Sequence, residues 1–289
     1  MEIENKNSGG LSTGVRRIIC YIVLIFLTFL CLFFFYVMII NATRTNADIQ
    51  KGFSFLPGKQ IVSNFKKVME NSTGQMPMFR GLLNSLIVAG CSCVLTTYFS
   101  SMTAYAIHCY DFKLKKVAFT FILMIMMVPT QVTALGFVRL MGTFHLTDSF
   151  WPLIIPSIAA PVVFFFMKQF MDSALPLEIV EAARIDGSNE FKTFNRIVIP
   201  IMKPAIAVQA IFAFTTSWNN YFLPSLLITK TDLKTVPIII ALVRNENPSE
   251  LDLGKVYMMI LMAILPIMIV YIILSKSIVE GVAIGSVKG

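Results

Sequence analysis

The sequence predicts an all-α membrane protein with six transmembrane helices and both termini in the cytoplasm. The chain of 289 residues is 56% hydrophobic and 14% charged, whereas soluble domains carry about 25% charged residues. Its mean hydropathy of +0.74 is too high for a water-soluble domain of this size. A bilayer-spanning helix needs roughly 20 consecutive apolar residues. The charge-free stretches that qualify are residues 18–40, 81–107, 117–138, 149–167, 205–229 and 256–275.

The first span follows a polar N-terminal tail, residues 1–17, that ends in Arg16-Arg17. This arrangement is similar to the start of a signal peptide, but the charge-free run 18–40 is longer than the 7–15 residues of a signal peptide's apolar region. No small-residue cleavage site follows it. We therefore expect a retained helix with a cytoplasmic N-terminus.

The loops between the spans alternate in charge. The short loop 108–116 is basic and is predicted to be cytoplasmic, and the short loop 139–148 has one basic and one acidic residue and is predicted to be extracellular. Both agree with the positive-inside rule. The long loop 41–80 is predicted to be extracellular although it carries six basic residues. Short loops dominate orientation, so this conflict weighs less.

Prolines interrupt the later spans, and small residues line the second. A proline frees a backbone carbonyl, which needs a neighbouring helix or a water-filled cavity. Small residues let helices approach closely. Both features indicate a packed helical bundle. The prolines are Pro129, Pro152, Pro156, Pro161, Pro224 and Pro266, and Pro204 is expected to begin the fifth span, where its missing N–H costs little.

Several classes of function are disfavoured. The net charge of +8 is explained by basic residues flanking membrane spans rather than by a nucleic-acid site. His108 and His145 are the only histidines and form no HExxH motif, so neither a metal site nor an intramembrane hydrolase is indicated. The spans contain no ionisable Asp, Glu, Lys or Arg, which argues against a carrier driven by ions alone. The chain also has no GxxxxGK[ST] phosphate loop.

The charged loop 178–200, between the fourth and fifth spans, predicts a short helix–turn–helix on the cytoplasmic face. Pro176 can begin a helix, Gly187 can end it in a left-handed conformation, and Ser188 or Asn189 can cap a second helix. The second helix carries an apolar stripe. Its members are Phe191, Phe194, Ile197 and Val198. An amphipathic loop lying on the lipid surface has the same pattern.

The residue spacing in this loop resembles the EAA loop of binding-protein-dependent ABC importer permeases. Glu181-Ala182-Ala183 is followed at the family's spacing by Gly187, Ile197 and Ile199-Pro200, with Ile199 in place of the usual Leu. Further segments are similar to the carbohydrate branch of that family and to its smaller maltose- or oligosaccharide-permease subunit. They are Asn84-Ser85, Ala104-Tyr105-Ala106, Val128-Pro129, Trp218-Asn219-Asn220 and the tail 279–289.

The resemblance implies a type I ABC importer permease fold in a bacterial cell membrane. It implies a permease core over residues 81–278 and a cytoplasmic tail over 279–289, which would enter the ATPase interface unless it is an unstructured terminus. The implied partners are a second six-span permease in a heterodimer, two ATPase subunits that bind ATP and Mg²⁺, and an extracellular sugar-binding lipoprotein. The chain itself would bind no cofactor or metal and catalyse no reaction. The residues implied in ATPase coupling are Glu181, Ala182, Ala183, Asp186, Gly187, Ile197 and Pro200.

The solute path is expected to be lined by polar and aromatic residues of the third and fifth spans. The candidates are Gln131, Trp218, Asn219, Asn220 and Tyr221. Each is also compatible with a helix–helix hydrogen bond or an interfacial aromatic position. The loop 230–255 is expected either to reach into the binding protein's sugar cleft or to lie as a lid on the membrane. The expected solute is an oligosaccharide, and the alternatives are a non-sugar solute or an ion-coupled carrier.

Overall fold

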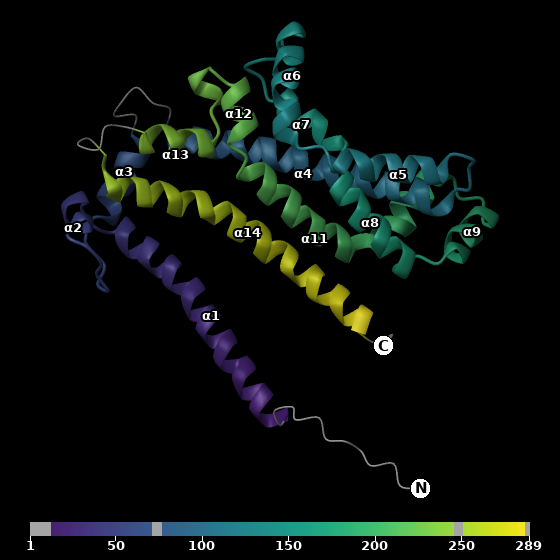
Figure 1. Ribbon diagram of the computed structural model, residues 1–289, viewed down its shortest axis with the longest axis horizontal. Helices are drawn as coiled ribbons and strands as arrows, with labels where there is room; N and C mark the ends of the chain where they lie inside the picture. The colour runs from purple at the N-terminus through teal and green to yellow at the C-terminus, as the bar shows by residue number, and fades with distance from the viewer. Residues whose placement is uncertain (1–12, 71–76, 246–250, 287–289) are drawn as a thin grey trace. The chain divides into compact units, whose positions relative to one another are not determined.

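The computed structural model describes the backbone of residues 13–70, 77–245 and 251–286, and the side chains of these residues up to Lys276. Within these ranges the chain forms helices and connecting turns and no strand (Figure 1), so the predicted all-α class is confirmed. The α-helices are α1 (Thr13–Ala42), α2 (Asn46–Gln50), α3 (Ile61–Met69), α4 (Met78–Cys109), α5 (Lys115–Met126), α6 (Thr130–Thr143), α7 (Trp151–Ile154), α8 (Pro161–Ala174), α9 (Leu177–Ile185), α10 (Glu190–Thr193), α11 (Ile199–Trp218), α12 (Phe222–Leu227), α13 (Val236–Arg244) and α14 (Leu253–Ser286). Three short segments complete the set: the 3₁₀ turns η1 (Ile155–Ile158) and η3 (Thr231–Leu233) and the π-helical turn η2 (Phe194–Val198).

Five of the described helical segments are long and apolar enough to cross a membrane, or six when the bent pair α5 and α6 is taken as one span. The first, second and sixth predicted spans lie within α1, α4 and α14. The backbone of α14 continues to Ser286, and the rest of the predicted tail 279–289 lies outside the described residues.

The third and fifth spans differ from the prediction. The third is broken at Val128-Pro129, where α5 and α6 meet at 93°, because a proline disfavours helical backbone in the residue before it. The fifth is a helical run over Glu190–Trp218 that ends well before Thr229. The expectation that Pro204 begins this span is wrong, since Pro204 lies inside α11 and Pro200 occupies the first turn.

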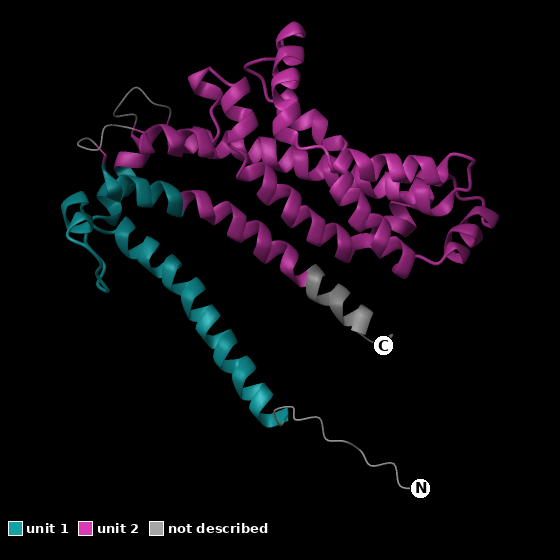
Figure 2. Cartoon of the chain, viewed as in Figure 1, with its two compact units in different colours: residues 1–66, 252–261 teal, residues 67–251, 262–289 magenta. Residues whose placement is uncertain are grey.

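The structure divides into two compact units (Figure 2). Unit 1 comprises residues 1–66 and 252–261 and contains a folded part of the long loop. The buried Asn64 side chain donates to the carbonyls of Ala42 at 2.9 Å and Arg44 at 3.0 Å. The buried Arg44 guanidinium donates to the Asn41 side chain at 3.1 Å. The charged side chain of Arg44 therefore stabilises the folded loop. This structural role explains one of the basic residues that make loop 41–80 disagree with the positive-inside rule.

Unit 2 comprises residues 67–251 and 262–289, and its helices α7, α8, α11 and α13 pack against α4 (Figure 1). At the start of α4, the Asn84 side chain donates to the carbonyls of Asp232 at 2.9 Å and Lys234 at 3.0 Å. The Ser85 hydroxyl accepts from the backbone N–H of Val236 at 2.9 Å. These bonds hold the loop that carries α13 against α4.

The fourth span is interrupted, and α4 compensates for the interruption. Prolines begin α7, η1 and α8, and two residues between η1 and α8 are not helical. Three hydroxyls of α4 at four-residue spacing donate to carbonyls of this segment. They are Ser92 to Leu153 (3.3 Å), Thr96 to Ser157 (2.9 Å) and Ser100 to Ala160 (3.4 Å). A neighbouring helix thus satisfies carbonyls at the break, as the prolines require in a membrane.

Candidate functional site

The loop singled out by sequence forms an elbow, residues 175–200, between α8 and α11. Its first helix, α9, begins after Pro176 and ends at Ile185, and Gly187, two residues later, has a φ of +76° in the left-handed region. The N–H of Ser188 bonds to the carbonyl of Ala183 at 2.9 Å, and the N–H of Gly187 bonds to the carbonyl of Arg184 at 3.0 Å. This is a Schellman ending, which favours glycine at the left-handed position. The predicted turn residue therefore has the backbone that its role requires.

The second helix of the elbow begins at the cap predicted from the sequence. The Asn189 side chain accepts a hydrogen bond from the N–H of Lys192 at 2.8 Å, which satisfies one of the free donors at the helix start. From Glu190 the chain is helical through the π-turn η2 into α11. The elbow thus joins its two flanking helices with few unconstrained residues.

An ionic network fixes the elbow to α4. The Arg184 Nε donates to Glu190 Oε1 at 2.7 Å, and the Tyr105 hydroxyl donates to Glu190 Oε2 at 2.7 Å. The Arg184 guanidinium also lies over the ring of Tyr110, 5.3 Å from its centroid. The hydrogen bond to Glu190 raises the pKa of Arg184 above its ordinary value. Glu190 is therefore the residue through which α9, α11 and α4 are connected.

The outward side of α9 is left uncovered. Glu181, Ala182 and Asp186 are exposed, and Ile185 is 86% exposed. The opposite side is packed: Val180 and Ala183 are buried, and Val180 belongs to the apolar core formed with α4, α8, η2 and α11.

Some of the remaining elbow residues are exposed and others are buried. Ile197 is half-buried, and Pro200 is exposed in the first turn of α11. In the predicted apolar stripe, Phe194 and Val198 are buried, but Phe191 is 72% exposed. Sequence periodicity does not separate these positions, because it does not tell which side of the helix the neighbouring helices cover.

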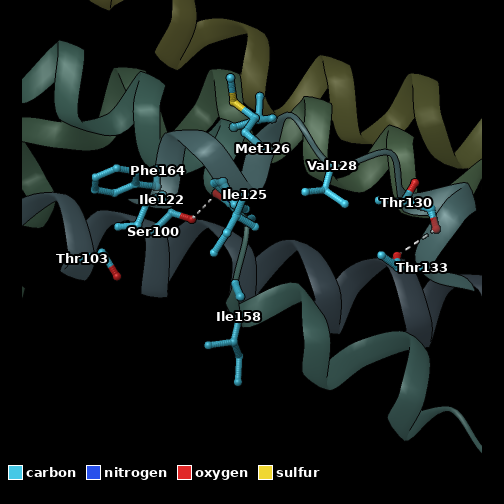
Figure 3. A pocket seen from close by; sticks show the side chains of 14 residues that line it. Ser100, Thr103, Ile122, Ile125, Met126, Val128, Thr130, Thr133, Ile158 and Phe164 are labelled. Carbon is cyan, nitrogen blue, oxygen red and sulfur yellow. Dashed lines mark hydrogen bonds between the residues drawn. The ribbon is translucent and has the colours of Figure 1, made fainter. Parts of the chain in front are cut away.

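Two cavities lie in unit 2. The first, the bend cavity, has a volume of about 660 Å³ and lies where α5 and α6 meet, against the break before α8. Figure 3 shows that its labelled side chains are mostly apolar, with Ser100, Thr103, Thr130 and Thr133 as the polar ones. The second, the α4/α8/α11 cavity, has a volume of about 840 Å³.

The structure brings one predicted path residue, Asn220, to the wall of the α4/α8/α11 cavity. Trp218 is buried, donates its indole N–H to the carbonyl of Ala263 at 3.1 Å and stacks on Phe214. Gln131, Asn219 and Tyr221 are exposed and line neither cavity.

The polar lining that sequence reasoning missed is mostly uncharged. Gln209, Thr216 and Ser217 of α11 line the α4/α8/α11 cavity, as do Ser92 and Thr96 of α4. The sequence does contain one indication of this lining: Gln209 is a glutamine inside an otherwise apolar span. A search limited to ionisable residues does not find it. No cluster of three or more potential metal-ligating residues occurs in the part of the chain that the structure describes.

The long apolar helices are those of a multi-pass membrane protein with an uncovered elbow. The model of the family "binding-protein-dependent transport system inner membrane component" matches residues 97–277. The arabinooligosaccharide transport permease AraQ of Bacillus subtilis is 32% identical, with 96% of this chain and 97% of AraQ covered. The lactose transport permease LacG of Rhizobium radiobacter is 29% identical over 96% of this chain and 99% of LacG.

The sn-glycerol-3-phosphate transport permease UgpE of Salmonella typhimurium is 30% identical over 86% of this chain and 90% of UgpE. A crystal structure of a bacterial ABC transporter for import of the acidic polysaccharide alginate contains a chain with a TM-score of 0.76 and 20% identity, covering 93% of this chain and 99% of that one. The chain belongs to the family of inner membrane components of binding-protein-dependent transport systems. The predicted family and the predicted location in a bacterial cell membrane are thus confirmed.

Proposed function

We propose that this chain is the permease subunit of an ATP-driven importer for a sugar, in particular an oligosaccharide. In this proposal its elbow is the contact for a separate ATPase. The observation that carries the proposal is the uncovered side of α9, which is joined to α8, α11 and α4 through packed and hydrogen-bonded residues.

The elbow has the properties of a mechanical contact. An ATPase groove would take the exposed side of α9, with Glu181 as the polar contact and Ala182 as the point of close approach. Ala183 would act from within, since its small side chain is buried on the opposite side of α9. Asp186 and Gly187 would set the turn, and Ile197 and Pro200 of the second half would carry the motion into α11.

The proposed assembly contains a second six-span permease, two ATPase subunits that hold ATP and Mg²⁺, and an extracellular sugar-binding lipoprotein. In this assembly both termini and the elbow face the cytoplasm, and the loop that carries α13 faces the binding protein. Alternating access would come from the motion of two permeases against each other.

A sugar is favoured over a phosphate-bearing solute by the lining of the α4/α8/α11 cavity. Its lining residues carry hydroxyl and amide groups and aromatic rings, but no Lys or Arg. An anionic phosphate is usually recognised by cationic groups. The relatives' names include both arabinooligosaccharides and sn-glycerol 3-phosphate, so the non-sugar reading is retained as the second candidate.

The elbow's role is tested by two substitutions at Gly187 in the transporter complex reconstituted in proteoliposomes. No atom lies within 4 Å of a Cβ added at Gly187, so a substitution there is strained only by its backbone. Asparagine tolerates the left-handed conformation, whereas proline cannot adopt a positive φ and lacks the N–H that bonds to Arg184. We expect Gly187→Asn to retain ATP-driven sugar uptake and Gly187→Pro to abolish it while the chain still inserts. Normal uptake by the inserted Gly187→Pro protein would refute the coupling role.

A further inference from the structure

The α4/α8/α11 cavity contains polar groups that the protein fold does not use. Its hydroxyls on α4, Ser92 and Thr96, are bonded to carbonyls of the interrupted fourth span. Gln209 on α11 is different. It is 7% exposed and lines the cavity, and its side chain has no hydrogen-bond partner in the described part of the chain. Its amide atoms are not among the fully buried unpaired atoms of the described residues, so they are accessible from the cavity. An amide without a protein partner there needs water or a ligand to bond to.

Gln209 is one of several unused polar groups on the same wall. Thr216 lies seven residues further along α11, which places it on the same side of the helix and about 10 Å along its axis. Asn220 follows in the turn after α11, and all three line the cavity. None of their side chains has a hydrogen-bond partner among the described residues.

Aromatic rings complete the same cavity. Phe166 of α8 and Phe212 of α11 line it and are 50% and 63% exposed, so part of each ring is open. A sugar ring combines hydroxyls at its edge with C–H groups on its faces. Amide and hydroxyl groups can bond to the former, and aromatic faces can pack against the latter. A lipid chain would cover the phenylalanines but would leave the Gln209 amide unpaired.

We propose that this cavity is a saccharide subsite of this chain, in which the Gln209 amide bonds to sugar hydroxyls and Phe166 and Phe212 contact sugar rings. The proposal rests on the proposed sugar-import function and assigns part of the path to this chain rather than to the partner permease. The spacing of Gln209, Thr216 and Asn220 along α11 suits a linear oligosaccharide better than a single sugar.

The subsite acts after the binding protein has released its sugar. Its loss should therefore reduce the amount of sugar moved per ATP, and not the capture of sugar by the binding protein. The test uses the full complex with its binding protein in proteoliposomes, and the probes are arabinotriose, lactose and glycerol 3-phosphate. Sugar uptake and ATP hydrolysis are measured together for the unmodified complex and for variants.

The main variant, Gln209→Met, keeps the shape of the side chain and removes its amide. The loss of one amide–hydroxyl hydrogen bond weakens binding by up to about tenfold. We expect the amount of saccharide moved per ATP to fall by a factor of this size. Thr216→Val, at an exposed position of the same wall, should cause a smaller fall without affecting the fold. Gln209→Asn, which retains an amide, should lose less than Gln209→Met. The matched control is Gln169→Met, because Gln169 is exposed on α8 and does not line the cavity.

The outcomes separate the subsite from the general function. If the unmodified complex takes up glycerol 3-phosphate and neither saccharide, the proposed sugar function fails, and the subsite fails with it. If the complex takes up a saccharide but Gln209→Met and Thr216→Val leave the sugar-to-ATP ratio unchanged, the subsite alone is overturned. A more stable Gln209→Met complex with an unchanged ratio would identify the cavity as a lipid contact, which also overturns it.

Discussion

The sharpest test of the elbow is the removal of one hydroxyl, with Tyr105→Phe. This substitution removes the hydrogen bond to Glu190 Oε2, whose length is 2.7 Å. It retains the ring, which is buried and packs against Phe194 at a centroid distance of 5.5 Å. The change therefore removes the charged hydrogen bond between α4 and the elbow without opening a cavity.

The expected magnitude follows from the exposure of the carboxylate. A hydrogen bond to a charged group contributes about 1.5–3 kcal/mol, but the Glu190 side chain is 43% exposed, and water replaces much of the lost bond. We therefore expect roughly 1 kcal/mol. The Arg184–Glu190 ion pair is similarly exposed and contributes about 0.5–1 kcal/mol. Loss of Glu190 by Glu190→Gln should thus cost about 2 kcal/mol in coupled transport.

The assay is a double-mutant cycle on ATP-driven uptake, with ATP hydrolysis measured in parallel. Rates convert to free energies through RT ln of their ratio. Tyr105→Phe alone should slow uptake about fivefold while ATP hydrolysis persists, and the same change in a Glu190→Gln background should have little further effect. The reasoning is refuted if the two effects are additive within about 0.3–0.5 kcal/mol, as they are for independent sites.

The matched control is Tyr98→Phe on the same helix. The Tyr98 ring also packs against Phe194, with a centroid distance of 5.6 Å. Its hydroxyl, however, donates to the uncharged Asn195 side chain at the longer distance of 3.3 Å. We expect a loss below about 0.5 kcal/mol for Tyr98→Phe. An equal effect of the two substitutions would indicate that any phenol on α4 matters, and not the ionic network.

Three further predictions concern the loops. Gly254→Ala places a Cβ 2.8 Å from the carbonyl oxygen of Arg44 and from Asn64 Nδ2. We expect the free energy of unfolding to fall by about 1–3 kcal/mol, which a lower melting temperature would show. An unchanged melting temperature would contradict the close packing around Gly254. Asn84→Ala leaves the carbonyls of Asp232 and Lys234 without their donor. The free energy of unfolding should fall by about 2 kcal/mol, and the measurement is faster proteolysis after Lys234. Asp148 accepts hydrogen bonds from the backbone of Lys230 and from Thr229, which lower its pKa. Since the bonded carboxylate is stabilised, its contribution should be complete above about pH 5 and should be lost progressively as the pH falls through the lowered pKa, so that the melting temperatures of Asp148→Asn and the unmodified protein should differ more at pH 7 than at pH 3.

Local rules predicted the elbow well because its conformation is decided within a few residues. The left-handed turn at Gly187 and the cap at Asn189 each depend on backbone groups no more than five positions away. The pairing of Glu190 with Tyr105 joins residues 85 positions apart. It depends on which helices are neighbours, and a single sequence does not specify this.

The spans show the same division between local and distant causes. Pro129 signalled an interruption, but the 93° between α5 and α6 depends on the packing around them. Pro204 could have begun a helix, yet the helix already extends from Glu190, and the tertiary packing of α11 tolerates the proline inside it. The cavity residues were missed for another reason: Gln209 is uncharged, and its lack of a partner is evident only once its neighbours are known.

The positions of these features along α4 suggest where the protein yields when the elbow moves. Near its end, α4 is tied to the elbow by a charged carboxylate at 2.7 Å. In its middle, it is tied to the interrupted fourth span by neutral hydroxyl–carbonyl bonds of 2.9–3.4 Å. Two of the neutral contacts, at 3.3 and 3.4 Å, are long for O–H···O bonds, so a force applied at α9 should move the elbow and the end of α4 together and should strain the middle contacts first. The contacts of Ser92 and Thr96 lie at the wall of the α4/α8/α11 cavity, and the interrupted helix is therefore the place where a displacement of the elbow would change the size of that cavity.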